Sequence, residues 1–177
     1  MTIETMSQAG ATAEPAARAS GDLNQFVSFA IADDQYGVDI MAVREIKGWS
    51  QICPLPGQPD YMRGVLNLRG VMVPIIDLRC RFGQGITEAT PIHIVIVVQI
   101  DGRQVGLLAD RVLDIVNVEP AKMQPVPRIA EAARVDFLSG LVTVESGMIA
   151  LIDLSRLLAM AVGDGAELGT ARQSVAA

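Results

Sequence analysis

The chain has 177 residues, of which 50% are hydrophobic and only 4% aromatic, so a folded core must be largely aliphatic. Twenty acidic against fourteen basic residues give a formal net charge of −6, and the basic residues are spread singly, which argues against binding to nucleic acid or to a membrane surface. The longest apolar stretch, Ile92–Ile100, is much shorter than the roughly 20 residues of a membrane-spanning helix, and it predicts a buried strand.

The two ends of the chain differ from its middle in composition. Residues 1–22 are rich in Ala, Thr, Ser and Gly without periodicity, which predicts a disordered N-terminal tail. They lack the apolar segment of a signal peptide, so we expect a cytoplasmic protein whose Cys53 and Cys80 stay reduced. Residues 163–177 predict a mobile C-terminal tail, which leaves 23–162 as the folded domain.

Between the tails, short runs of Val, Ile and Leu alternate with turn residues. Phe26–Ile31 and Tyr36–Ile40 flank Asp33-Asp34, an arrangement typical of a β-hairpin. Ile40–Lys47 and Leu154–Met160 have apolar residues three and four positions apart, so we predict short helices there. The remaining runs indicate an all-β barrel or sandwich.

An internal repeat divides the folded region into two units, about 26–82 and 93–158. When the sequence is shifted along itself, Gly37 falls on Gly106, and with a slightly larger shift Gly64 falls on Gly140. Further coincidences, with the second-unit residue after the first, are Gln35 with Gln104, Val43 with Val112, Ile46 with Ile115, Met72 with Met148, Ile76 with Ile152, Asp77 with Asp153 and Leu78 with Leu154. Strand sequences align partly by chance, but blocks in the same order favour a duplication. Because each unit is small for its own core, we expect the two to pack together and leave a seam.

Residue types suited to catalysis or metal binding are few. The single histidine, His93, lies in an apolar run, which indicates a packed or edge residue. Cys53 and Cys80 are distant in sequence and have no histidine nearby, unlike zinc ligands or reactive thiols. Asp77 and Asp153 could form a carboxylate pair, but their shared Ile-Asp-Leu context favours capping of a turn or short helix. We therefore expect no catalytic residue, cofactor or metal.

The two units differ in charge at one informative position. Glu45 corresponds to the acidic Asp114, whereas Arg69 corresponds to Glu145. Glu45 and Arg69 could both be ordinary solvated charges. An arginine needed only for the barrel should recur in both units, however, so we interpret Arg69 as specific to a contact made by the first unit.

Five segments of the folded region carry recognisable motifs: the hairpin Phe26–Ile40, Val43–Ile46, residues 67–79 (NLRGVMVPIIDLR), Gly106–Asp110 and Leu151–Leu154. Together these segments resemble the CheW family of bacterial chemotaxis coupling proteins. The resemblance covers nearly the whole folded region, with the segments in the family's order and without large gaps. It implies an all-β fold of two SH3-like five-stranded β-barrels, packed pseudo-symmetrically on a shared core, with short helices.

The resemblance also implies function and partners. Family members are non-enzymatic adaptors that couple methyl-accepting chemoreceptors to the histidine kinase CheA, whose regulatory domain has the same fold. The receptor tip docks in the groove between the barrels, so the protein would be cytoplasmic and recruited to membrane-associated receptor arrays, without direct contact to lipid or nucleic acid. A paralogous coupling protein of a non-flagellar chemosensory pathway is the alternative.

Site residues follow from the resemblance position by position. Glu45 and Arg69 match receptor-contact charges, and Val43 and Gly64 fall where substitutions are expected to impair receptor coupling. The internal repeat adds an opposite wall of the groove by pseudo-symmetry. The expected receptor-binding residues are Val43, Glu45, Ile46, Gly64, Arg69, Val112 and Ile115.

A second segment, Met123–Ile129, matches a region proposed to contact the kinase in ring-shaped arrays. The expected kinase-binding residues within it are Met123, Gln124, Arg128 and Ile129.

Overall fold

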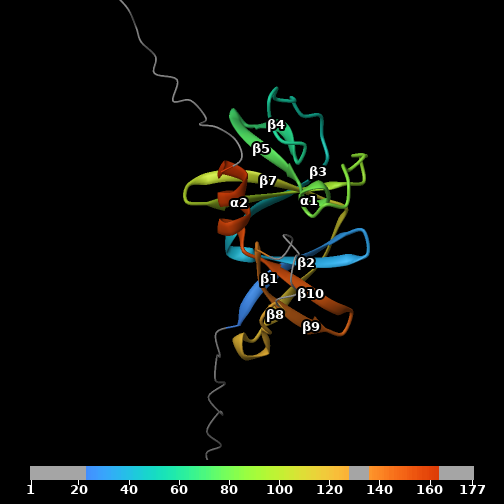
Figure 1. Ribbon diagram of the computed structural model, residues 1–177, viewed down its shortest axis with the longest axis vertical. Coiled ribbons are helices and arrows are strands. Elements are labelled where there is room, and N and C mark those ends of the chain that lie inside the picture. Colours follow the sequence, from blue (N-terminus) through green and yellow to red (C-terminus); the bar gives the residue numbers. More distant parts are fainter. Residues whose placement is uncertain (1–22, 128–135, 164–177) are drawn as a thin grey trace, which may run out of the picture.

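A computed structural model of the protein describes residues 23–127 and 136–163. The expected N-terminal tail, 1–22, lies outside the described residues, as do 164–177 of the expected C-terminal tail. The described chain consists mostly of strands, which are joined by turns and longer loops, with few helices (Figure 1).

Each repeat unit contains five strands and ends in a helix. The first unit comprises β1 (Asn24–Ile31), β2 (Asp34–Asp39), the 3₁₀ turn η1 (Ile40–Ala42), β3 (Val43–Gly48), β4 (Met62–Leu68), β5 (Val71–Asp77) and α1 (Leu78–Arg81). The second comprises β6 (Ile94–Ile100), β7 (Arg103–Ala109), β8 (Arg111–Val118), the 3₁₀ turn η2 (Pro120–Lys122), β9 (Leu138–Val144), β10 (Gly147–Ile152) and α2 (Leu154–Gly163).

The strands form two five-stranded sheets that share the same order once the repeat is taken into account. Barrel A has the order β8-β1-β2-β10-β9, and barrel B has the order β3-β6-β7-β5-β4. Replacing each strand of barrel A by its repeat counterpart gives barrel B. Each barrel therefore takes two strands from one unit and three from the other, and the units are interleaved. The expected pair of five-stranded barrels is confirmed.

Equivalent strand pairs join the two units within each barrel. Gly37 of β2 pairs in parallel with Leu151 of β10, and Gly106 of β7 pairs in the same way with Ile75 of β5. These four residues correspond under the repeat. Both parallel ladders are long-range contacts, since each connects a strand of the first unit to a strand of the second.

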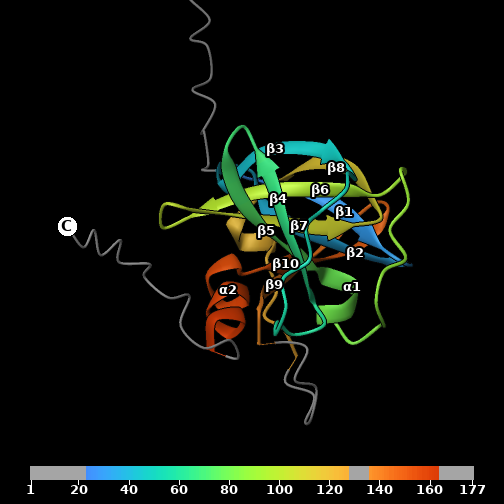
Figure 2. The ribbon, with the colours of Figure 1, turned by 90° about the horizontal axis from the view of Figure 1, so that it is seen from above.

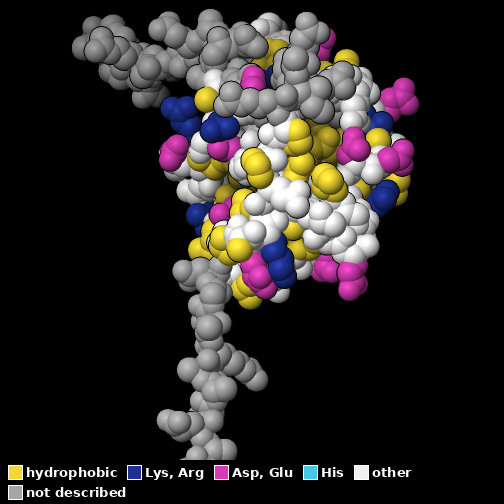
Figure 3. All heavy atoms as spheres, turned by 60° about the horizontal axis from the view of Figure 1, so that its bottom comes forward, with side chains coloured by type: hydrophobic (Ala, Val, Ile, Leu, Met, Phe, Trp, Pro, Cys, Tyr) yellow, Lys and Arg dark blue, Asp and Glu magenta, His cyan; other side chains and the backbone are white. Residues whose placement is uncertain are grey.

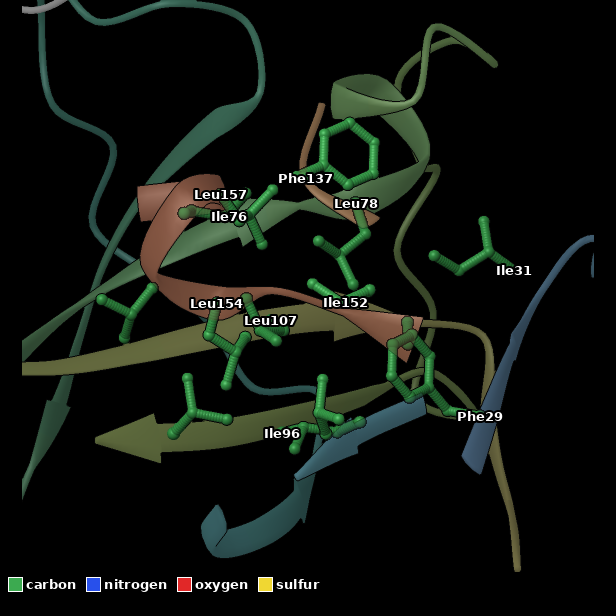
Figure 4. Packing of buried hydrophobic residues seen from close by; sticks show 14 of the residues in the cluster. Phe29, Ile31, Ile76, Leu78, Ile96, Leu107, Phe137, Ile152, Leu154 and Leu157 are labelled. Atoms are coloured by element: carbon green, nitrogen blue, oxygen red, sulfur yellow. The ribbon is translucent and has the colours of Figure 1, made fainter. Parts of the chain in front are cut away.

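The hydrophobic core has a shared centre and a smaller cluster inside each barrel. The shared cluster takes buried residues from both units, including Phe29, Ile76, Leu107 and Ile152, whose side chains converge in Figure 4. Five buried residues fill barrel A and seven fill barrel B. The shared cluster explains how two small units stay folded, because neither buries enough apolar surface alone.

Of three local predictions, two are confirmed and one is wrong. The hairpin is confirmed, since β1 and β2 pair antiparallel with Ile31 opposite Asp34. The helix predicted over Ile40–Lys47 is wrong, because a 3₁₀ turn over Ile40–Ala42 is followed by strand β3. Apolar residues three apart fitted a helix, but β3 pairs with β6, a strand of the second unit that the local pattern cannot reveal. The predicted helix over Leu154–Met160 is confirmed as part of α2.

Candidate functional site

Four of the expected receptor-binding residues lie on equivalent edge strands. Val43 and Ile46 belong to β3 at one edge of barrel B, and Val112 and Ile115 belong to β8 at one edge of barrel A. Figure 2 shows β3 and β8 on the same side of the molecule. We call these four residues the β3/β8 surface.

The β3/β8 surface combines packed and exposed apolar side chains. Val43 and Val112 are partly buried against the shared core cluster, so both barrels meet the same core at these valines. Ile46 and Ile115 are 43% and 52% exposed, which leaves much of each side chain available for a contact. The surface thus offers one exposed isoleucine on each barrel, at equivalent positions of the repeat.

Glu45 and Arg69 form an ion pair beside this surface. Nη2 of Arg69 lies 3.0 Å from Oε2 of Glu45, with 83% of the arginine side chain exposed against 29% of the glutamate. The pair connects β3 to the turn after β4, and these two strands are the opposite edges of barrel B. Exposed ion pairs contribute only about 0–1 kcal/mol, so this pair adds little to the stability of barrel B. The arginine side chain stays accessible to a partner because most of it is exposed.

The backbone fixes where Arg69 stands. Leu68 pairs with Val71, so Arg69 and Gly70 alone form the turn between β4 and β5. Their φ angles of 51° and 88° match a type I′ turn, which requires positive φ at both central residues. Oδ1 of Asn67 also accepts a hydrogen bond of 2.8 Å from the Gly70 backbone N–H. The turn therefore holds Arg69 in one place next to Glu45.

The equivalent positions in barrel A are both acidic. Asp114 and Glu145 occupy the positions of Glu45 and Arg69, and both are exposed. Within 23–127 and 136–163, neither of them forms a salt bridge, although the Asp114 carboxylate accepts a hydrogen bond of 2.7 Å from the backbone N–H of Ile115. The charge difference between the units is thus also a structural difference between the barrels.

Gly64 lies inside barrel B rather than on its surface. It is buried in β4, next to Val65, whose backbone bridges that of Cys53. A residue without a side chain in a buried position cannot itself contact a partner. The expected effect of Gly64 on receptor coupling would have to act through the shape of β4.

In the described part of the segment expected to bind the kinase, Gln124 bridges to Leu141 of β9, the other edge of barrel A. Gln124 is exposed, and its backbone exchanges two hydrogen bonds of 2.8 Å with that of Leu141. Met123 is partly buried against the cluster inside barrel A. Arg128 and Ile129, also expected to contact the kinase, lie outside the described residues. The structure places this segment on a different strand edge from β3 and β8.

His93 and Asp77 have structural partners. His93 immediately precedes β6, where its Nδ1 accepts a hydrogen bond of 3.0 Å from the backbone N–H of Thr90. Its Nε2 lies 3.6 Å from Asp110, which in turn accepts a 2.6 Å hydrogen bond from Arg79. Asp77 caps α1 through Cys80, and Asp153 caps α2 through the backbone of Arg156, so the expected capping is confirmed.

Basic and acidic side chains are mixed on the surface of the molecule. On the face shown in Figure 3, Lys and Arg side chains are scattered among Asp and Glu side chains. Within the described residues, no three His, Cys, Asp or Glu side chains are grouped so that they could hold a metal ion. In the same part of the chain, no helix has the length and apolar character needed to cross a membrane.

The two cysteines are expected to differ in reactivity. Cys53 is exposed, whereas Cys80 is partly buried, and burial, assisted by the negative charges of Asp77 and Asp60, raises the pKa of the Cys80 thiol. A raised pKa lowers the fraction of reactive thiolate at a given pH. We expect iodoacetamide to alkylate Cys53 before Cys80 in the native protein, measured by mass spectrometry of timed digests. Equal rates in the native protein would contradict this, and equal rates in urea serve as the control.

One buried polar contact near the β3/β8 surface was not expected from the sequence. The Ser28 hydroxyl bonds both backbone groups of Asp114, with distances of 2.8 Å and 3.0 Å. Its only signal in the sequence is a single hydroxyl within the apolar run of β1.

Comparisons with known proteins agree with this architecture. The family model described as a CheW-like domain matches residues 25–162. "Chemotaxis protein CheW" of Rhizobium meliloti is 42% identical over 130 residues, which cover 73% of this chain and 84% of the relative. The protein of the same name in Klebsiella aerogenes is 37% identical over 134 residues, which cover 76% of this chain and 81% of that relative.

Among solved structures, the scaffolding protein TtCheW from Thermoanaerobacter tengcongensis is similar to this chain, with a TM-score of 0.68 and 31% sequence identity. The match covers 75% of this chain and 85% of that one. Both the family model and the relatives extend over most of the two interleaved barrels. The chain therefore belongs to the family of CheW-like domain proteins.

Proposed function

We propose that this protein is a non-enzymatic adaptor in bacterial chemotaxis, which couples methyl-accepting chemoreceptors to the histidine kinase CheA and helps to assemble receptor arrays. Relatives that share its fold are named chemotaxis and scaffolding proteins. The observation that carries the proposal is the β3/β8 surface, where equivalent isoleucines of the two barrels are exposed beside the Glu45–Arg69 pair. The proposed place of action is the cytoplasmic side of the membrane-associated array.

The β3/β8 surface suits a helical receptor segment. Helices bind other proteins through apolar side chains spaced along one face, and Ile46 and Ile115 offer one exposed apolar contact on each barrel. Flanking charges add orientation more than affinity. Arg69 provides such a charge on one side only, because its counterpart in barrel A is Glu145.

We assign the kinase contact to the segment that follows η2. Its backbone is held against β9 by the Gln124–Leu141 bridge, which fixes the exposed Gln124 at an edge of barrel A. Met123, Arg128 and Ile129 complete the proposed contact. Separate strand edges for the receptor and for the kinase allow an adaptor to hold both at once.

Reversing the charge of Arg69 should abolish receptor pull-down without unfolding the protein. Arg69→Glu is expected to lose about 2 kcal/mol, or about 30-fold in affinity, because the reversal replaces an attraction across the interface by a like-charge repulsion. The fold should persist because barrel A already has acids at both equivalent positions. The measurement is pull-down of a receptor cytoplasmic fragment, with circular dichroism and binding to the CheA regulatory domain as controls.

Two further variants separate a direct contact from loss of the ion pair. Arg69→Asn removes the charge but keeps a residue that tolerates positive φ, so the turn is preserved. The double variant Glu45→Arg with Arg69→Glu restores an ion pair with the charges exchanged. We expect both to bind the receptor weakly. Full receptor binding by the exchanged pair would show that Arg69 acts only within barrel B and would overturn the proposed contact.

A further inference from the structure

Ser28 makes an unusual set of contacts in the middle of β1. It is 2% exposed and is one of three buried polar residues in the described part of the chain. The other two, Asp77 and Thr87, bond each other. The hydroxyl of Ser28 instead donates to the backbone carbonyl of Asp114 at 2.8 Å and accepts from the Asp114 N–H at 3.0 Å. One hydroxyl therefore satisfies both backbone groups of a residue on β8.

These contacts occur where the β1–β8 ladder is interrupted. Val27 pairs with Ile115 and Phe29 with Val112, so two residues of β8, Leu113 and Asp114, face Ser28 alone. Such a β-bulge leaves backbone groups without ladder partners and changes the direction of nearby side chains. The Ser28 hydroxyl takes the place of the missing backbone partners, since a hydroxyl can donate and accept at once.

The equivalent position in barrel B has a different solution. Val97 is the counterpart of Ser28 in the alignment that places Gly37 on Gly106, and it pairs directly with Glu45, the counterpart of Asp114. A bulge between Val43 and Glu45 is present there too, but the ladder resumes at Glu45 without help from a side chain. A serine is thus not required by the fold of a barrel, and its presence in barrel A calls for a separate reason.

Ile115, the residue that follows the bulge, provides a reason for the serine in barrel A. The backbone of Asp114 is held by Ser28, and the Asp114 carboxylate accepts a 2.7 Å hydrogen bond from the backbone N–H of Ile115. Two consecutive polar contacts therefore lead from the buried hydroxyl to Ile115, which is 52% exposed. We infer that Ser28 is a positioning residue for receptor binding: through the β8 bulge it fixes the presentation of Ile115 on the β3/β8 surface. This inference rests on the proposed function.

The test compares Ser28→Val with Ser28→Thr, two variants that add the same volume and differ in the hydroxyl. We expect Ser28→Thr to bind a receptor cytoplasmic fragment about fivefold to tenfold more tightly than Ser28→Val, the size of effect expected from a lost buried hydrogen bond. Both should bind the CheA regulatory domain equally, because the hydroxyl of Ser28 bonds Asp114 of β8 and not the segment after η2. Amide exchange at Asp114 should be faster in Ser28→Val, and Ser28→Ala provides the same comparison without added volume.

The outcomes are distinguishable. Equal receptor affinity of the valine and threonine variants, or equal amide exchange at Asp114, would overturn the inference. A loss of receptor and kinase binding of the same size would also overturn it, since it would mean general destabilisation. Failure of the wild-type protein to bind the receptor fragment would instead overturn the proposed function, and amide exchange at Asp114 would still decide whether Ser28 holds the bulge.

Discussion

Gly64→Ala is expected to lower the free energy of unfolding by roughly 3 kcal/mol or more, from backbone strain and overpacking together. Gly64 has a φ of 137°, which side chains other than hydrogen rarely allow. A Cβ at this position would stand 2.2 Å from the backbone O of Cys53 and 2.8 Å from its carbonyl carbon. Backbone atoms cannot move aside as a flexible side chain can, so β4 would separate from the Cys53 segment.

The repeat supplies a matched control for this variant. Gly140 is the counterpart of Gly64 in β9, but its φ lies outside the positive range and its added Cβ would be 3.1 Å from the backbone O of Gln124. A small shift accommodates that contact, so Gly140→Ala should cost about 1 kcal/mol. Urea unfolding followed by circular dichroism measures both. Similar losses for the two variants would contradict the role of the Gly64 backbone.

The Gly64 result also bears on receptor coupling. If Gly64→Ala loses receptor binding together with stability, the effect originates in the fold of barrel B, in agreement with the burial of this residue. Arg69→Glu should lose receptor binding alone. A Gly64→Ala protein of normal stability that does not bind the receptor would require a direct contact near β4.

Asp77→Ala is expected to destabilise the protein by about 3–5 kcal/mol, as is typical when one partner of a buried ion pair is removed. Asp77 is fully buried, and its Oδ2 lies 3.2 Å from Nη1 of Arg63. It also accepts hydrogen bonds of 2.7 Å from both the backbone N–H and the hydroxyl of Thr87, and one of 3.2 Å from the Cys80 N–H. The carboxylate thus holds α1, β4 and the connection to the second unit together. Alanine would leave the Thr87 and Cys80 donors without this acceptor, while Arg63 would keep its hydrogen bond to the Thr87 backbone carbonyl.

Asp153→Ala is the corresponding control in the second unit. Asp153 caps α2 and forms an ion pair of 3.3 Å with Arg156, whose side chain is 63% exposed. Water can replace these contacts, so the expected loss is about 1 kcal/mol, the usual effect of removing an N-cap. Thermal and urea unfolding of the two variants should therefore differ clearly. An Asp77→Ala protein as stable as Asp153→Ala would show that burial of this carboxylate does not contribute to folding.

Much of the fold could be predicted because the internal repeat, which is visible in the sequence, shows that two distant parts of the chain have the same arrangement of strands. Matching Gly37 with Gly106 and Gly64 with Gly140 revealed two related units, and both pairs lie on equivalent strands. The segment from Ile40 to Lys47 could not be assigned in this way, because its apolar spacing fits a helix and a strand alike. Its conformation depends on pairing with β6, and nothing near it in sequence encodes that pairing.

Residues of the candidate site could be named from the sequence, but their contacts could not. Glu45 and Arg69 were both expected at the receptor surface, yet their ion pair depends on the two edges of barrel B approaching each other. Gly64 was grouped with them, although the structure places it in the interior. Ser28 was missed, because the role of a serine in an apolar strand becomes visible only when the strand opposite to it is known to contain a bulge.

By itself, the sequence determined the type of protein: an aliphatic β-fold of two related units, with acids capping the helix of each and a charge difference at Arg69 and Glu145. These features depend on residue types and on short spacings between residues, and both can be found directly in the sequence. Only the tertiary structure decided that the units exchange strands, that Asp77 is buried while Asp153 is not, and that Ser28 reaches Asp114. Such contacts join residues far apart along the chain, and they exist only once the strands have closed into barrels.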